Sequence, residues 1–204
     1  MRKTSRQLAY LGLCTAVALI LAYVEALLPP LFTAVPGIKL GLPNIAIIFV
    51  LYRYGVRRAA IVSFIRIAVV TMLFGNPMTF AYSLAGAALS LLVMALLRRA
   101  DFLSTVGVSV AGGVFHNVGQ ILMAMLLLGT AELGYYLIVL AITGTVSGIF
   151  VGICGACAIM VGMRVGRGDH EDAYRAAKRF SIATPIFAAV LGLAMVCTRN
   201  PILH

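Results

Sequence analysis

Three side chains that can form hydrogen bonds lie close together in a stretch that is otherwise apolar. The run VFHNVGQILM, residues 114–123, contains His116, Asn117 and Gln120. On a helix, residues three and four apart share a face, so these side chains point into one sector. Imidazole and amide groups both donate and accept hydrogen bonds, which suits them to holding a polar ligand. The spacing therefore predicts a polar site on one face of an apolar helix.

Two ionisable residues occur in equally apolar surroundings, Glu25 in AYVEALLPP and Arg66 in VSFIRIAVV. A charged side chain inside a membrane costs about 2.5–3.5 kcal/mol on insertion scales, so such residues face a cavity or one another. The loop over residues 29–44, PPLFTAVPGIKLGLPN, adds Lys39 and Asn44. We expect these four residues and the polar helix to converge on one pocket, with the Lys39 loop as a lid.

Two interpretations of this polar set are open. In the simpler one, Glu25 neutralises Arg66 and the amides hold helices together, since interhelical hydrogen bonds contribute about 0.6 kcal/mol on average. In the other, the set binds a ligand, and the combination of charged groups, amides and a lid-like loop favours this interpretation. Lys39 and Arg66 outweigh Glu25, and an arginine holds a carboxylate or phosphate with two parallel hydrogen bonds. We expect an anionic or a mixed polar and aromatic ligand.

The elements that position these residues must be membrane helices. Hydrophobic residues make up 62% of the 204, charged residues 11%, and the mean hydropathy is +1.06. Soluble domains contain about 45–50% apolar and about 25% charged residues. A spanning helix needs about 20 mostly apolar residues. The sequence predicts an all-α integral membrane protein, a six-helix transmembrane bundle with spans at 7–28, 42–54, 59–75, 79–97, 104–128 and 135–163.

The predicted domain organisation follows from these spans. We expect a six-span membrane domain over residues 1–166, a basic cytoplasmic linker over 167–180 and an additional hydrophobic segment over 181–204. The last segment contains a candidate seventh helix at 181–197, which is shorter than the others. The basic start MRKTSR precedes a long apolar run without a small-residue cleavage site, so the first span is expected to be retained.

Basic residues give the expected orientation. Among the predicted spans, Arg66 lies inside one, and Lys39 and Arg199 lie on one side of the membrane. The remaining Lys and Arg residues all lie on the other side of the membrane: Arg2, Lys3, Arg6, Arg53, Arg57, Arg58, Arg98, Arg99, Arg164, Arg167, Arg175, Lys178 and Arg179. The positive-inside rule then places the amino terminus in the cytoplasm of a multi-pass protein of the cell membrane. The net charge of +10 reflects this topology and attraction to anionic membrane lipid. It requires no nucleic-acid partner.

Small residues recur every four positions in two spans. The first span has the pairs Gly12 and Ala16, and Ala18 and Ala22, whereas the sixth has TGTVSGIFVGICGA, residues 143–156. Such stripes allow helices to approach closely. Packing within the protein is the default explanation for each stripe, and a docking surface for a partner membrane subunit is the alternative.

No motif in the sequence predicts an enzyme, a metal site or a cofactor. Cys154 and Cys157 form a CxxC among small apolar residues, which favours helix packing over a redox or metal role. The acidic cluster in GDHEDAY extends from Asp169 to Asp172, and acidic residues at a helix start explain it. The nucleotide-binding pattern GxxxxGK[ST] is missing from the chain, so active transport would take its energy from a partner or an ion gradient.

Several motifs together resemble the Gx transporter family, whose members are often labelled heptaprenyl diphosphate synthase component I. They are PGIKLGLPNI from Pro36, Arg66, LFGNP from Leu73, SLAGAALSLLVMALL from Ser83 and GVFHNVGQ from Gly113. The resemblance covers about residues 5–165, and the tail beyond Gly166 is not part of it. Members resemble the substrate-binding S components of energy-coupling-factor transporters.

The resemblance implies a six-helix bundle that binds a micronutrient-like compound from outside, with a flavin or quinone precursor as a weak preference. It also implies docking of the first span, through Gly12, Ala16, Ala18 and Ala22, on a transmembrane coupling subunit driven by ATPases. We expect Arg66 to hold the anionic group, His116 and Gln120 to hydrogen-bond the ligand, and Glu25, Lys39, Asn44 and Asn117 to complete the pocket.

The family label raises an alternative, a non-catalytic membrane accessory subunit in isoprenoid or quinone synthesis. Prenyltransferases of the trans type hold magnesium and diphosphate with DDxxD motifs, and the sequence contains none. A catalytic role is therefore not expected, although a partner could supply the catalysis.

Overall fold

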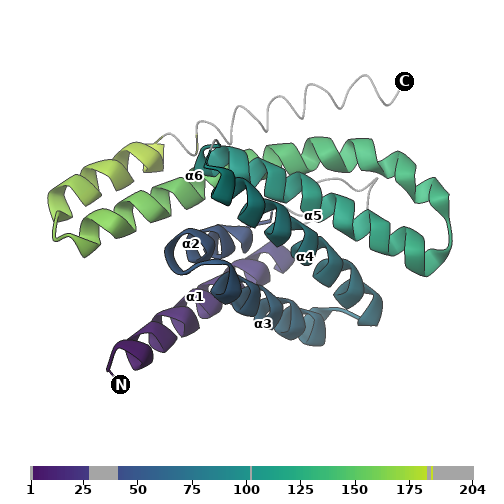
Figure 1. The fold of residues 1–204 in the computed structure, drawn as a ribbon, viewed down its shortest axis with the longest axis horizontal. Helices are drawn as coiled ribbons and strands as arrows, with labels where there is room; N and C mark the ends of the chain where they lie inside the picture. The colour runs from purple at the N-terminus through teal and green to yellow at the C-terminus, as the bar shows by residue number, and fades with distance from the viewer. Residues whose placement is uncertain (1, 28–40, 102, 183–184, 186–204) are drawn as a thin grey trace. The chain divides into compact units, whose positions relative to one another are not determined.

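The computed structural model of the chain describes residues 2–27, 41–101, 103–182 and 185, and these are helical with short turns between helices. The predicted all-α fold is confirmed (Figure 1). The elements are α1 (Arg2–Leu27), α2 (Asn44–Tyr54), α3 (Val56–Phe74), α4 (Pro77–Ala100), α5 (Thr105–Leu128), the 3-10 helix η1 (Ala131–Tyr135) and α6 (Tyr136–Gly166). Residues 170–182 are also helical. Lys39 and most of the candidate seventh helix, 181–197, lie outside the described residues.

Four of the described helices are long and apolar enough to cross a membrane alone: Ser5–Leu27, Pro77–Ala100, Thr105–Leu128 and Leu137–Gly166. They establish the chain as a membrane protein. The predicted second and third spans are helices too, but α2 has 11 residues, about 16 Å, against a hydrocarbon core of about 30 Å. The 19-residue α3 carries Arg57, Arg58 and Arg66. The short α2 therefore depends on neighbouring helices to cover it, whereas several apolar side chains of α3 are exposed.

The chain divides into two compact units, Met1–Gly155 and Ala156–His204. The boundary falls inside α6. The first unit contains α1 to α5, η1 and the first part of α6, and the following paragraphs concern it alone.

The short helix α2 lies at the centre of the hydrophobic core of the first unit. Val50 and Leu51 are fully buried, and the same cluster contains Ala18 of α1, Val62 of α3 and Val108 of α5. A single residue, Gly55 with φ +88°, separates α2 from α3. This left-handed conformation favours glycine and allows the chain to reverse in one step. Burial of α2 thus compensates for its length.

Local signals fix the start of α4, which carries part of the candidate site. The side chain of Asn76 accepts a hydrogen bond of 2.8 Å from the Thr79 backbone N–H, and the Asn76 N–H donates to the Thr79 hydroxyl at 2.8 Å. Together they form a capping box, which satisfies backbone donors that have no partner within the helix. Pro77 follows as the first helical residue, where its missing N–H costs nothing.

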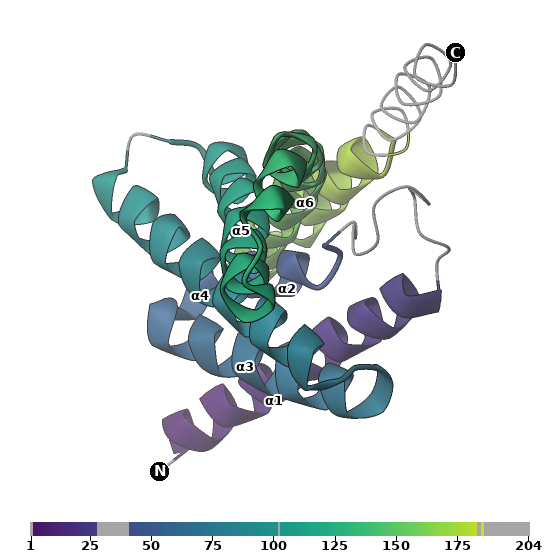
Figure 2. The ribbon, with the colours of Figure 1, turned by 90° about the vertical axis from the view of Figure 1, so that its right-hand side faces the viewer.

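Glycines allow α4, α5 and α6 to pack backbone against backbone. The helices α4 and α5 lie side by side and antiparallel (Figure 2), and a Cβ added to Gly119 would lie 2.8 Å from the Ala85 carbonyl oxygen. On α6, a Cβ on Gly148 would lie 2.5 Å from Cα of Val110, and one on Gly152 would lie 2.8 Å from Cα of Val106. The glycines of the sixth span therefore pack against other helices of the protein, which confirms the default explanation for this stripe.

The small residues of the first span divide into two faces of α1. Ala18 and Ala22 are 0% and 7% exposed and pack within the unit, whereas Gly12 and Ala16 are exposed. The expectation that Ala18 and Ala22 form a docking surface is therefore wrong for this conformation, because other helices already cover them. The docking role predicted for the exposed pair, Gly12 and Ala16, stays a prediction.

Arginines hold the helices together at one end of the first unit. Arg98, near the end of α4, donates to the carbonyls of Leu51 and Tyr52, and its guanidinium lies 5.1 Å from the Tyr52 ring centroid. Arg58, at the start of α3, donates to the Gln7 side chain at 2.9 Å. Arg98 thereby gives the Leu51 carbonyl a second donor besides the Gly55 N–H, and it supplies a donor to the Tyr52 carbonyl at the end of α2. We call the end of the unit that carries the arginines at residues 53, 57, 58, 98 and 99 the basic end.

Candidate ligand-binding site

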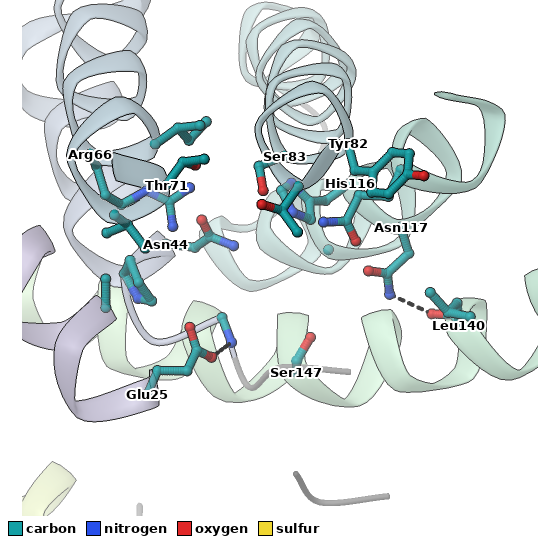
Figure 3. Close-up of a pocket in the computed structure, with 18 of the residues that line it drawn as sticks. Glu25, Asn44, Arg66, Thr71, Tyr82, Ser83, His116, Asn117, Leu140 and Ser147 are labelled. Atoms are coloured by element: carbon teal, nitrogen blue, oxygen red, sulfur yellow. Dashed lines mark hydrogen bonds between the residues drawn. The ribbon is translucent and has the colours of Figure 1, made fainter. Parts of the chain in front are cut away.

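A cavity of about 520 Å³ lies among the helices of the first unit, and Figure 3 shows residues that line it. Of the seven residues predicted to bind a ligand, the structure brings six together around this cavity: Glu25, Asn44, Arg66, His116, Asn117 and Gln120. The seventh, Lys39, lies outside the described residues. Ligand pockets commonly have volumes of about 300–1,000 Å³. The cavity is thus large enough for a small organic molecule.

Arg66 lines the cavity from the middle of α3. Its Nε atom is buried and has no hydrogen-bond partner among the described residues. Figure 3 shows its side chain directed toward the same space as Asn44 and Ser83. A buried polar group without a partner costs about 1–3 kcal/mol, and more when it is charged. An anion that accepted from Arg66 would remove this cost.

Glu25, near the end of α1, secures the turn that leads into α2. Its carboxylate accepts a hydrogen bond from the Gly41 backbone N–H, and the Leu42 N–H lies 3.4 Å from the same oxygen. Gly41 has φ +74°, and its carbonyl accepts from the Asn44 N–H at 2.8 Å. This explains the order of residues in GLPN, residues 41–44, because glycine permits the turn and Pro43 is buried behind it. Glu25 therefore positions Asn44 as well as lining the cavity.

The polar residues of α5 line the cavity from the side opposite to Arg66. A Cβ on Gly86 of α4 would lie 2.7 Å from the His116 carbonyl oxygen and 2.8 Å from Cγ of Gln120. The glycine thus lets α4 press against the helix face that carries both side chains. Asn117 instead donates from its amide nitrogen to the Leu140 carbonyl of α6 at 2.6 Å (Figure 3). Asn117 therefore joins two helices, which leaves its carbonyl oxygen as the atom that can accept from a ligand.

The structure adds polar lining residues that the sequence interpretation missed. They are Thr71, Thr79, Tyr82, Ser83 and Ser147. Tyr82 and Ser83 follow Thr79 by three and four positions, so the three residues share one face of a helix. This shared face was the only sequence pattern that could have indicated them as lining residues. Serine and threonine in apolar helices commonly bond their own backbone carbonyls, which makes them weak indicators of a site.

All parts of the cavity lie toward the same end of the helices. Glu25 is close to the end of α1, and Asn44 begins α2. Residues 66–71 belong to the second half of α3, residues 79–83 to the start of α4 and residues 116–124 to the second half of α5. The arginines of the basic end, at residues 53, 57, 58, 98 and 99, occupy the other ends of α2, α3 and α4. The cavity thus lies toward the ends of α2, α3 and α4 that are opposite to the basic end.

The arrangement suits reversible binding. It offers one guanidinium, one carboxylate, amides, an imidazole, hydroxyls and apolar walls such as Ile67, Val70 and Leu140. In the described part of the chain, no group of three or more His, Cys, Asp or Glu residues is placed to hold a metal ion.

Fold and site together define a helical membrane protein with a cavity among its own helices that is lined by both polar and apolar side chains. Comparison with known protein families gives a match over residues 14–158, more than two thirds of the chain. The chain belongs to the family described as heptaprenyl diphosphate synthase component I, which is the Gx transporter family. The curated proteins and the solved structures that were compared gave no match.

Proposed function

We propose that this protein is the substrate-binding membrane subunit of a transporter, similar to an S component of an energy-coupling-factor system. It captures a small micronutrient-like, anionic compound in the cavity around Arg66. The observation that carries the proposal is the buried Nε of Arg66, which lacks a partner among the described residues and lines a cavity of about 520 Å³. A group held only for packing would be expected to find a protein partner.

The lining predicts the chemical class of the ligand. Arg66 offers a planar fork that matches a carboxylate or a single phosphate. Glu25 is already engaged by the Gly41 N–H, and its charge limits the total anionic charge that the cavity accepts. Tyr82 and the apolar walls suit a flat organic body. A compact anion with a flavin-like or quinone-precursor-like body fits this description best.

The direction of binding follows from the basic end. With Arg53, Arg57, Arg58, Arg98 and Arg99 on the cytoplasmic side, the amino terminus is cytoplasmic and the cavity belongs to the outer half of the cell membrane. A cavity there would receive its ligand from outside.

A partner would supply the energy for uptake. We infer a transmembrane coupling subunit with ATPases, as the resemblance to S components implies, and the sequence contains no nucleotide-binding loop of its own. The exposed pair of small residues on α1, Gly12 and Ala16, would allow a partner helix to approach closely. Exposed apolar side chains beside it, Leu13 at 61% and Ile20 at 60%, would be covered by lipid or by that partner.

The second candidate is a non-catalytic accessory subunit of a heptaprenyl diphosphate synthase, a role suggested by the family description alone. In that role the protein would anchor a catalytic partner at the membrane, and the chain itself would perform no chemistry. The polar cavity would then serve helix packing, and its substitution would not affect the partner's activity.

Native mass spectrometry of the full chain, purified gently from its own membranes, tests the proposal. We expect a small anion bound one to one. Replacing Arg66 with Ala removes charge-assisted hydrogen bonds of about 1.5–3 kcal/mol, which corresponds to about 10–150-fold weaker retention. Arg99→Ala is the matched control, because it removes an exposed arginine of the basic end. Absence of any small molecule, together with co-purification of a prenyl synthase subunit, would support the accessory role instead.

A further inference from the structure

A second cavity, of about 310 Å³, lies in the unit Ala156–His204. Its lining comes from the last turns of α6 and from the helix over residues 170–182: Met160, Arg164, Asp172, Arg175, Ala176, Arg179 and Phe180. We call it the basic groove. Residues 160–180 fall beyond the matched family region, which ends at residue 158. The family description therefore assigns nothing to it.

The basic groove exists because the chain reverses directly after α6. Gly168 has φ +86°, and the Asp169 N–H donates to the Arg164 carbonyl at 3.0 Å, which closes the end of the helix. The helix over residues 170–182 then returns beside α6 (yellow-green in Figure 1), with Ala173 and Ala176 only 4% and 5% exposed. These small residues let the two helices approach, and the long side chains on either side of them form the groove walls.

Positive charge dominates the basic groove. It contains three arginines and one aspartate, a formal charge of +2. The three arginines differ in their partners. The Arg175 guanidinium is held by Glu171 at 2.6 Å, and Nη1 of Arg164 lies 3.5 Å from the Asp172 carbonyl. Arg179 makes no hydrogen bond or ion pair within the described part of the chain. The groove thus presents guanidinium donors to an anion.

The length of α6 sets the depth of the basic groove in the membrane. The helix has 31 residues and is about 46 Å long, whereas the hydrocarbon core is about 30 Å thick. Counted from Leu137, about 20 residues cross the core, so the helix from about residue 157 onward lies among the lipid headgroups. Met160 and Arg164 are therefore at the depth of lipid phosphates. Phe180 and Met160 provide apolar contacts next to the charged donors.

We propose that the basic groove binds the phosphate of an anionic phospholipid. Arg164 and Arg179, from the two helices, hold the phosphate oxygens, and Arg175 adds charge from a position fixed by Glu171. A guanidinium fork matches phosphate geometry. The bound lipid fastens the helix over residues 170–182 to the end of α6. This proposal is independent of the ligand bound near Arg66.

Lipid titration followed by native mass spectrometry tests the proposal. The full chain is delipidated in detergent and titrated with phosphatidylglycerol or, separately, phosphatidylcholine. We expect one phosphatidylglycerol to bind more tightly than the others and more tightly than phosphatidylcholine. A basic residue near the membrane surface contributes about five-fold in affinity. The Arg164→Gln/Arg179→Gln variant should therefore weaken the tightest phosphatidylglycerol by about 25-fold.

The matched control is Arg167→Gln/Lys178→Gln, which removes the same charge from the same hairpin without touching the groove lining. Arg179→Gln alone, at an exposed position, should weaken binding about five-fold and keeps the test valid if Arg164→Gln disturbs folding. Equal losses in both double variants would mean diffuse surface attraction and would overturn the proposal. Displacement of phosphatidylglycerol by inorganic phosphate at the same concentration would also overturn it, since a free phosphate would then be the ligand.

Discussion

The contact between α5 and α6 supports one wall of the cavity, and a single methyl group is enough to test it. In Gly148→Ala, the new Cβ would lie 2.5 Å from Cα of Val110 and 2.9 Å from the Ser109 carbonyl oxygen. These are backbone atoms, which a side-chain rotation cannot move aside. Carbon atoms pack at about 3.5–4.0 Å, so the helices must separate by about 1 Å.

The expected cost follows from this separation. Overpacking of a close contact costs about 1–3 kcal/mol. Alanine regains about 0.5–1 kcal/mol over glycine in a helix interior, which leaves a net loss of up to about 2.5 kcal/mol. For a chain of about this size, 1 kcal/mol corresponds to about 2–4 °C in Tm. We therefore expect Gly148→Ala to lower Tm by up to about 10 °C in detergent.

The same substitution at Gly12 is the control. A Cβ there meets nothing within 4 Å, and the position is exposed on α1. Gly12→Ala should leave Tm unchanged or raise it by about 1–4 °C. Because Ser147 is the neighbour of Gly148 and lines the cavity, Gly148→Ala should also reduce ligand retention. Because both variants gain the same helix propensity, a Tm for Gly148→Ala as high as that of Gly12→Ala would refute the close packing of α5 and α6.

Three further outcomes are expected from substitutions near helix ends. Asn76→Ala removes the capping box of α4 and should cost about 0.5–2 kcal/mol, measured as a lower Tm; an unchanged Tm would contradict the cap. Gly41→Ala forces a non-glycine residue to φ +74° and places its Cβ 3.2 Å from Nδ2 of Asn44. Ligand retention should therefore fall, and full retention would argue against this turn. Arg98→Gln removes the guanidinium from the carbonyls at the end of α2 and should lower Tm more than Arg99→Gln; equal shifts would count against that role.

The sequence predicted much of the site because helical spacing and buried charge are strong signals. His116 and Gln120 share a face at any helix tilt, and Arg66 in an apolar run has few alternatives to a cavity. Spacing did not reveal which face of α1 is covered, and Ala18 and Ala22 proved to be inside. A four-residue stripe has the same pattern whether it meets the protein's own helices or a partner.

Other features depended on how loops fold. Glu25 was expected either to neutralise Arg66 or to line a pocket, but its carboxylate also accepts from the Gly41 N–H. That contact requires the left-handed turn at Gly41, which a hydropathy pattern does not encode. Likewise, the shortness of α2 was visible in the sequence, whereas its central position in the core was not. Whether the cavity residues bind a ligand stays a prediction.

Accessibility of the cavity from one side of the membrane is the most direct test of the uptake role. In a chain whose four cysteines are replaced by alanine, Ser83→Cys places a single thiol in the cavity, and Arg99→Cys places one at the basic end. We expect a membrane-impermeant maleimide added outside intact cells to label Ser83→Cys and not Arg99→Cys. Labelling of Arg99→Cys from outside, with Ser83→Cys protected until the cytoplasmic face is opened, would contradict a cavity that receives its ligand from outside.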